Sequence, residues 1–261
     1  METNAYHAKP LHILGVNFPK LDYTSALALF DSWIKAKSPH QVCIANVHTI
    51  ISCQSDFELR DINNQALATM DGLPLVWYAN RVLDAGVSRV CGPDLMLRCL
   101  DLGREKGWRH YFLGGKPEVL EDLQQMMQAA YPGVRIVGAY SPPFRPLSEA
   151  EDQALVDRIN AAEPDFLWVG LGAPKQEKWI ASHLGRVRAP VQLGVGAAFD
   201  FHSGHVNRAP LWMQKCGLEW FYRMCMDRRL IKRYLTTNPI FLALFARDWL
   251  RFKVLKRPAA G

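Results

Sequence analysis

Short apolar runs alternate with amphipathic helical patterns along most of this chain, and this alternation constrains its fold more than any other feature. Leu11–Phe18 and Gln41–Ala45 are predicted strands, and a helix is expected over Tyr23–Lys37 between them. Farther along, Asp165–Val169 and Val191–Val195 are apolar enough to be strands that are buried on both faces. Because strands and helices alternate, the sequence predicts an α/β fold with a Rossmann-like parallel sheet flanked by helices.

The middle of the chain repeats the alternation. The elements expected there are a strand at His110–Leu113, a helix from Pro117 to about Ala130, a strand at Val134–Val137 and a helix at Ser148–Ala162. Ser148 is expected to cap the last of these helices through its hydroxyl. No internal repeat or low-complexity segment interrupts the pattern.

The end of the chain has a different pattern. From Pro210 to Arg257 there is no strand signal, only helical runs rich in aromatic residues and arginine. Pro239 is expected to break this region and to leave Ile240–Lys256 as the final helix. Aromatic and aliphatic bulk with basic flanks is typical of a helix in a membrane interface, although a core-packing helix with a solvated basic face fits the same composition. The basic excess favours the membrane.

Positive charge is concentrated in that same region. The chain has 31 basic and 25 acidic residues, a net charge of +6. From Phe201 onward there are 12 Lys and Arg against three acids, +9, so the first 200 residues carry −3. Such asymmetry indicates an anionic partner: a nucleic acid, a membrane surface or a phosphorylated ligand. With 49% hydrophobic and 21% charged residues, a disordered or fibrous chain is excluded.

Location and redox state follow from what the sequence does not contain. The apolar stretch Ile240–Ala246 is far shorter than the roughly 20 residues that span a bilayer. The first ten residues lack a basic segment followed by an apolar run, so we expect a cytoplasmic protein.

The six cysteines form no C-x-x-C pair and have no histidine at zinc-finger spacing. We therefore expect buried free thiols and no metal site.

Polar and glycine-rich segments follow the predicted strands. They are Asn46, His48 and Thr49; Asp71-Gly72; Gly114-Gly115; Gly170, Gly172, Lys175 and Gln176; and Gly196 and Asp200. Open α/β sheets bind their ligands at the carboxyl ends of the strands, so the fold predicts that these residues meet at one rim.

Several candidate residues have a structural interpretation beside the functional one. Gly114-Gly115 can present backbone N–H groups to a phosphate, yet it matches neither G-x-G-x-x-G nor a Walker A loop and also fits a tight turn. Asp71 is a candidate general base, although Asp-Gly pairs are common in turns, and His48 is a second candidate base. Arg208 can hold a diphosphate bidentately, or lie in a surface loop.

Several runs together resemble one family. They are ANVHT (Ala45–Thr49), MDGLPLVW (Met70–Trp77), RVCGPDLM (Arg89–Met96), GAPKQEKW (Gly172–Trp179) and GVGAAFDFHSGHVNRAPLWMQKCGLEWFYR (Gly194–Arg223). They closely resemble the WecG/TagA/CpsF glycosyltransferases, and the resemblance extends from about Leu11 to Arg233. It implies an inverting transfer of a sugar from a UDP-sugar to a polyprenyl-diphosphate-linked saccharide at the cytoplasmic membrane face, for teichoic acid, capsule or exopolysaccharide synthesis. It implies no metal or other cofactor.

The resemblance also assigns roles to residues of this chain. Asp71 corresponds to the family's proposed base, and Asn46 and Gln176 to its other catalytic positions. The residues expected to bind substrate, from the resemblance or from their place after the strands, are Thr49, Arg89, Gly114, Gly115, Gly172, Lys175, Asp200, Arg208, Arg228, Arg229 and Arg233. We therefore expect a Rossmann-like catalytic domain at 1–209 and a helical, membrane-associating appendage at 210–261. The enzyme would be peripheral on the inner face of the membrane.

One position departs from the family pattern. Teichoic-acid members tend to carry Thr two positions before the Asn, where this chain has Ile44, so the N-acetylmannosamine donor is not carried over and a glucose-like donor fits equally. Two other classes remain as alternatives. A Rossmann oxidoreductase would need a glycine fingerprint after the first strand, where this chain has Asn17-Phe18-Pro19-Lys20. A non-enzymatic nucleic-acid or membrane-binding protein would use the basic tail but give the rim residues no role.

Overall fold

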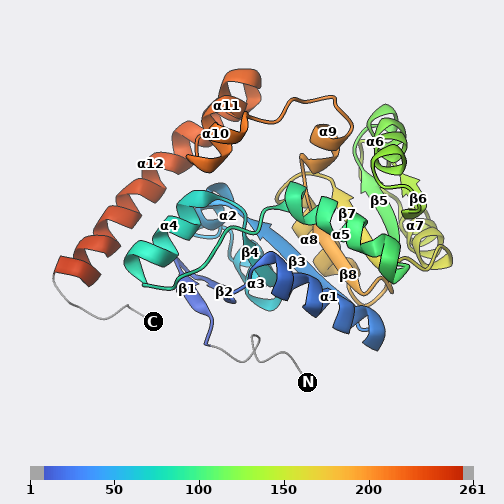
Figure 1. Cartoon of the computed structure of the whole chain (residues 1–261), viewed down its shortest axis with the longest axis horizontal. Coiled ribbons are helices and arrows are strands. Elements are labelled where there is room, and N and C mark those ends of the chain that lie inside the picture. The colour runs from blue at the N-terminus through green and yellow to red at the C-terminus, as the bar shows by residue number, and fades with distance from the viewer. Residues whose placement is uncertain (1–8, 255–261) are drawn as a thin grey trace. The chain divides into compact units, whose positions relative to one another are not determined.

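The computed structural model describes residues 9–254 and has a mixed α/β architecture built on one parallel sheet (Figure 1). The sheet contains six strands in the order β4-β3-β8-β7-β5-β6. Their bounds are β3 His40–Ala45, β4 Leu67–Met70, β5 Arg109–Gly114, β6 Arg135–Tyr140, β7 Phe166–Gly170 and β8 Val191–Gly194. The Rossmann-like α/β fold predicted from the alternation is confirmed.

The chain divides into two compact units. Unit 1 consists of residues 1–22, 45–91 and 208–261, and unit 2 of residues 23–44 and 92–207. Unit 2 holds α1 Tyr23–Ala36, α5 Gly92–Lys106, α6 Pro117–Ala130, α7 Glu149–Ala161, α8 Lys175–His183 and α9 Ala198–His202. The domain boundary expected at 209/210 stays a prediction.

In unit 2, successive side chains of β7 point to opposite faces of the sheet and pack against helices on each face. Leu167 and Val169 belong to a buried cluster with residues of α7 and α8. Phe166 and Trp168 point the other way, and the ring of Phe166 meets Phe30 of α1 edge-on at 5.9 Å. Successive side chains of a strand point to opposite faces, so a continuous apolar run needs helices on both sides.

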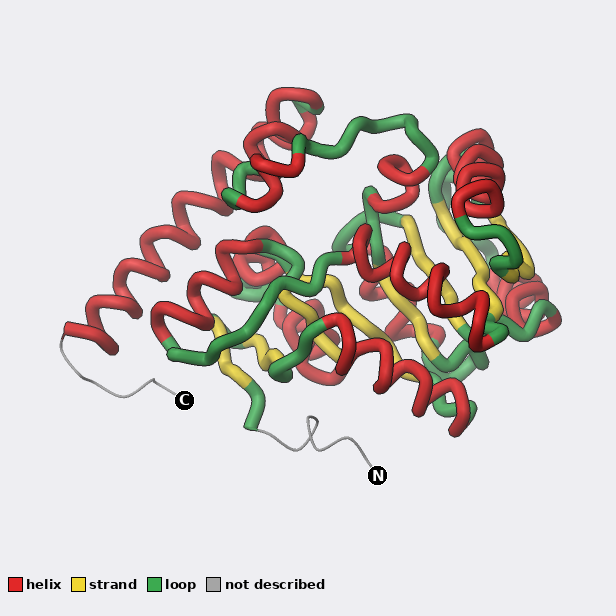
Figure 2. Tube along the Cα trace, viewed as in Figure 1, coloured by secondary structure: helices red, strands yellow, loops and turns green. Residues whose placement is uncertain are grey.

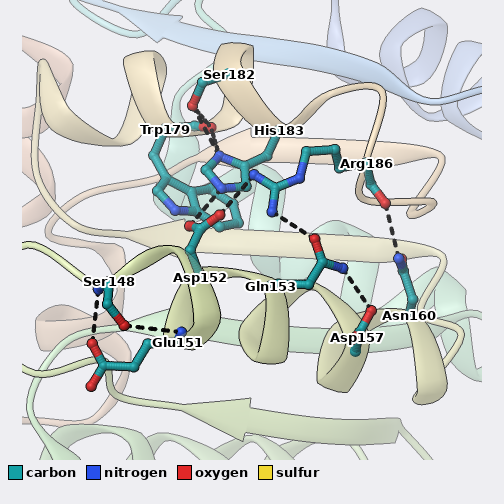
Figure 3. A network of polar contacts seen from close by, with 10 residues as sticks. All are labelled: Ser148, Glu151, Asp152, Gln153, Asp157, Asn160, Trp179, Ser182, His183 and Arg186. Atoms are coloured by element: carbon teal, nitrogen blue, oxygen red, sulfur yellow. Dashed lines mark hydrogen bonds and ion pairs between the residues drawn. The ribbon is translucent and has the colours of Figure 1, made fainter.

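A polar network joins α7 to α8 in unit 2 (Figure 3). Nε2 of His183 lies 2.9 Å from Oδ1 of Asp152, whose other oxygen pairs with Arg186 at 2.7 Å. Although Ser182 completes a Ser-His-Asp set, Nδ1 of His183 also contacts the carbonyl of Trp179 at 2.7 Å, and the His183 side chain is only 8% exposed. This set therefore stabilises the packing of two helices.

At the start of α7, the expected Ser148 cap is confirmed as a capping box with Glu151.

Unit 1 combines a hairpin with helices from both ends of the chain. Its elements are β1 Leu11–Ile13, β2 Val16–Phe18, α2 Val47–Ser52, α3 Phe57–Gln65, β4, α4 Leu73–Val82, α10 Leu211–Lys215, α11 Glu219–Met226, α12 Arg229–Trp249 and the π-helical turn η2 Leu250–Val254. Phe241 of α12 is buried in the same apolar cluster as residues of the hairpin, α2 and α4. The last long helix therefore completes the core of this unit.

Two predicted elements of unit 1 were wrong. The single strand expected over Leu11–Phe18 is an antiparallel hairpin with Ile13 paired to Val16. Leu14 and Gly15 form its two-residue turn with φ of 48° and 89°, the type I′ geometry that suits hairpins. The glycine supplies the positive φ that allows the chain to reverse.

The break expected at Pro239 does not occur either, and the predicted separate helix Ile240–Lys256 is wrong. α12 runs unbroken through the proline to Trp249, and η2 continues to Val254, while Lys256 lies outside the described residues (Figure 2). Pro239 is exposed, whereas Thr237 and Phe241 on either side of it are buried. Packing on both sides of the proline offsets the lost backbone hydrogen bond.

The predicted free cysteines are confirmed as thiols, but only four of the six are buried. Cys216 and Cys225 are exposed. Both belong to the helical C-terminal region, where side chains are less covered than in the sheet.

Candidate active site

Four charged residues of unit 1 form a cluster, in which one carboxylate pairs with two arginines. Glu219 accepts from Nη2 of Arg89 at 2.8 Å through one oxygen and from Nε of Arg208 at 3.1 Å through the other. Arg89 also donates from Nε to the backbone carbonyl of Asp71. The side chains of Arg89, Arg208 and Glu219 are only 20%, 18% and 15% exposed. We call Asp71, Arg89, Arg208 and Glu219 the arginine–carboxylate cluster.

The elements of unit 1 fix Asp71 at the end of a strand. Asp71 follows β4 directly, and its N–H donates to the carbonyl of Ala45 at 2.9 Å. Gly72 then begins α4 as its N-cap. A buried strand that ends in Asp-Gly before a helix thus leaves the carboxylate half-buried at the strand's carboxyl end.

The charges of this cluster lie close enough to shift the pKa of Arg89. Burial acts to lower the pKa of Arg89, but the negative charges of Asp71 and Glu219 outweigh it and raise that pKa. Arg208 also directs Nη2 to the sulfur of Cys91 at 3.5 Å. Arg89 therefore remains cationic beside Asp71, and Glu219 holds Arg208 next to Arg89.

Asn46 and Thr49 lie beside the Asp71-Gly72 pair. Asn46 is the N-cap of α2 and forms a capping box with Thr49, with N–O distances of 3.3 and 3.4 Å. A Cβ placed on Gly72 would lie 3.7 Å from the Cβ of Asn46, so the two segments are in close contact. The structure thereby brings the predicted residues Asn46, Thr49, Asp71, Arg89 and Arg208 together in unit 1.

His48 and Arg233 extend this region toward α12. Burial, assisted by the positive charge of Arg233, lowers the pKa of His48 to about 4. His48 is therefore neutral at physiological pH. Arg228 and Arg229 lie at the start of α12, about one turn before Arg233; both are exposed, and Arg229 pairs with Asp227 at 2.8 Å.

A second group of predicted residues, in unit 2, consists of glycines held by a buried amide. Oε1 of Gln176 accepts from the N–H groups of Gly172 and Gly196, each at 3.1 Å, and its Nε2 donates to Glu177 at 2.9 Å. Gln176 is 4% exposed, and a Cβ on Gly194 would lie 2.8 Å from its side chain. We call Gly172, Gln176, Glu177, Gly194 and Gly196 the glycine–amide cluster.

The remaining predicted glycines lie at the end of β5 in unit 2. Gly114 and Gly115 have φ of 106° and 74°, and the N–H of Gly115 donates to the carbonyl of Gly170 at 3.1 Å. A Cβ on Gly114 would come within 2.7 Å of that carbonyl, so only glycine fits there. Lys175 is exposed with Nζ 5.4 Å from the ring centroid of Phe144, and Asp200 is half-buried in α9.

The predicted site residues therefore form two local sets. Eight belong to unit 1 and six, namely Gly114, Gly115, Gly172, Lys175, Gln176 and Asp200, belong to unit 2. Between residues 9 and 254, no three His, Cys, Asp or Glu side chains form a group that could hold a metal ion.

Sequence reasoning missed Glu219, the residue that bridges both arginines. It lies in the Leu-Glu-Trp run and is one of only three acids from Phe201 onward. A single glutamate in so basic a segment was the signal that could have identified this residue. A carboxylate among many arginines usually pairs with a specific one of them.

A parallel sheet with polar and glycine-rich segments after its strands places the chain in the class of Rossmann-like α/β proteins. A model of the family described as "Glycosyl transferase WecG/TagA/CpsF family" matches residues 11–254, so the chain belongs to this family and is a glycosyltransferase. Similar proteins from Staphylococcus aureus strains MW2 and NCTC 8325 are each 30% identical over 257 residues, 94% of this chain and 95% of the relative. Both are named N-acetylglucosaminyldiphosphoundecaprenol N-acetyl-beta-D-mannosaminyltransferase.

Proposed function

We propose that this enzyme transfers a sugar, with inversion, from a UDP-sugar to a polyprenyl-diphosphate-linked saccharide in bacterial polysaccharide synthesis. The observation that carries the proposal is the arginine–carboxylate cluster, in which Arg89 lies beside Asp71 and Glu219 joins Arg208 to Arg89. The names of the staphylococcal relatives, which specify a diphosphoundecaprenol-linked acceptor, support the acceptor class.

The cluster supplies the two requirements of such a transfer. Asp71 takes the proton of the acceptor hydroxyl while the hydroxyl oxygen attacks the anomeric carbon. The bond from that carbon to the β-phosphate oxygen of UDP breaks, and its electron pair leaves with UDP. Arg89 and Arg208 stabilise the negative charge on the departing diphosphate. One carboxylate is enough for the proton transfer, so Glu219 is left to hold the arginines.

The glycine–amide cluster is suited to positioning. Because Oε1 of Gln176 already accepts two backbone N–H groups, we propose that this residue holds the Gly172 and Gly196 loops. Gly114 and Gly115 would bring backbone N–H groups to a phosphate of the donor. Lys175 and Asp200 remain proposed substrate-binding residues.

The C-terminal helices are proposed to dock on the membrane. Their exposed apolar side chains include Leu211, Trp212, Met226, Leu235 and Leu242, at 60–71% exposure, within a segment of net charge +9. None of the helices within residues 9–254 has the length and apolarity to cross a bilayer. Apolar exposure with a basic excess fits a peripheral enzyme whose basic residues Arg228, Arg229 and Arg233 reach the substrate.

The residue at position 44 bears on the choice of donor sugar. Ile44 is 9% exposed, and its Cγ2 would lie 3.3 Å from a Cβ on Gly92, so this position packs and offers no hydroxyl. An N-acetylmannosamine donor and a glucose-like donor are both compatible with the proposed transfer.

The test is UDP release from a panel of UDP-sugars with a polyprenyl-diphosphate-sugar acceptor. Asp71→Asn is expected to lower turnover by about 10²–10⁴-fold, because it keeps the shape of the base and removes its proton affinity. A thermal melt of the variant checks that the fold is intact. Undiminished acceptor-dependent release in a folded variant would remove Asp71 as the base, and release without acceptor would contradict the transfer.

A further inference from the structure

A cavity of about 210 Å³ lies within unit 1, away from the residues assigned to the reaction. Its walls come from the β1–β2 hairpin, the end of α4, the end of α12 and η2. Arg247 in this wall lies fourteen residues beyond Arg233 in α12, about 21 Å along the helix. A single water needs about 10–15 Å³, so the cavity has room for a larger group.

The polar side of this cavity is cationic. Arg247 and Arg251 both line it, together with the imidazole of His12. The one acid in the wall, Asp248, is occupied on both oxygens: it accepts from Nε of Arg247 at 2.8 Å and from the hydroxyl of Tyr78 at 2.7 Å. Arg251 has no hydrogen-bond or ion-pair partner among residues 9–254.

The other side of the cavity is apolar, and it borders exposed apolar side chains. Leu14, Leu83 and Phe252 line it. Leu250 and Val254 are 49% and 54% exposed, and each lies three residues after one of the two cavity arginines, a spacing that brings side chains together on a helix. Guanidinium groups beside exposed apolar side chains match a molecule that carries a phosphate on an apolar body.

We propose that this cavity binds the phosphate headgroup of an anionic membrane lipid, with Arg251 and the outer nitrogens of Arg247 on the phosphate and Phe252 against the glycerol backbone. Soluble phosphate esters share the headgroup chemistry but would leave the apolar wall uncovered. The assignment goes beyond the proposed transfer reaction, because this lipid is neither donor nor acceptor.

The experiment titrates the full chain with dihexanoyl-phosphatidylglycerol and, separately, with glycerol phosphate, following the chemical shifts of the His12 ring by NMR. We expect saturable binding of the short-chain lipid, weakened about tenfold or more in Arg251→Gln through loss of a charge-assisted hydrogen bond. Arg81→Gln is the matched control, because Arg81 is an exposed arginine of α4 that does not line the cavity. It should bind as the unaltered chain does.

Each other outcome overturns part of the proposal. Equal binding of glycerol phosphate would assign the cavity to a soluble phosphate ester, and equal loss in both variants would mean diffuse surface charge without a site. Absence of saturation with either probe would remove the site altogether. Turnover on a water-soluble acceptor should be unchanged in Arg251→Gln, so failure of this proposal and failure of the proposed function remain distinguishable.

Discussion

The two clusters of candidate site residues are built from different interactions. The arginine–carboxylate cluster of unit 1 is held by ion pairs, in which the one carboxylate of Glu219 pairs with two arginines that lie mostly out of water. The glycine–amide cluster of unit 2 is held by neutral hydrogen bonds from backbone N–H groups to Gln176. An incoming anion can replace a carboxylate, whereas no soluble ligand replaces a buried amide. The first cluster is thus suited to exchange partners during a reaction, and the second to stay fixed.

One of the two largest expected effects on stability comes from removing the carboxylate of Glu219, which an incoming anion would replace. Glu219→Gln should lower the free energy of unfolding by about 3–5 kcal/mol, because it removes the carboxylate that pairs with two largely buried guanidinium groups. Chemical denaturation would measure the change.

UDP provides the discriminating control for that variant. Its diphosphate should bind the released arginines and restore much of the lost stability, so the thermal shift on adding UDP should be larger in Glu219→Gln than in the unaltered chain. An equal or smaller shift would mean that Arg89 and Arg208 do not hold the diphosphate.

A loss of comparable size is expected in the second cluster. Gln176→Leu leaves the N–H groups of Gly172 and Gly196 without their acceptor, at a cost of about 1–3 kcal/mol for each group that stays dry. UDP should raise the stability of this variant no more than it raises that of the unaltered chain, since the missing partner is a neutral acceptor that a diphosphate does not replace. Rescue of Gln176→Leu by UDP to the same extent as Glu219→Gln would erase the distinction between the clusters.

The smallest effect concerns His48. Because burial is the main cause of its lowered pKa and Arg233 the lesser one, Arg233→Gln should raise the pKa of His48 from about 4 but leave it below 6.5. A lowered histidine pKa stabilises the folded chain fully above pH 6.5, and this contribution is lost as the pH falls toward 4. NMR titration of the ring would show the shift, and an unmoved midpoint would place Arg233 too far away to act.

Much of the fold could be predicted because local signals agreed with packing. Ser148 caps its helix, Pro117 begins one, and the apolar runs of β7 and β8 are buried as expected. The two errors arose where tertiary contacts override a local rule. Leu14 adopts a positive φ that its side chain disfavours, and Pro239 lies inside a helix that Phe241 anchors in the core.

The site was only partly predictable, for a similar reason. Residues that follow strands could be named because parallel strands end at one edge, and this gave Asn46, Asp71 and Gln176. Glu219 could not be selected in this way, because it starts a helix more than a hundred residues from Arg89 and its role depends on a distant pair.

The discontinuity of unit 1 has a consequence for the chain as it leaves the ribosome. All residues of unit 2 precede residue 208, whereas the core of unit 1 lacks Phe241 until the last part of the chain has been made. At about 5–20 residues per second, the partners of that phenylalanine wait roughly 8–30 seconds with apolar surface uncovered. Chaperone binding during synthesis should therefore be concentrated on residues 9–22 and 45–91 and end when the final helix emerges.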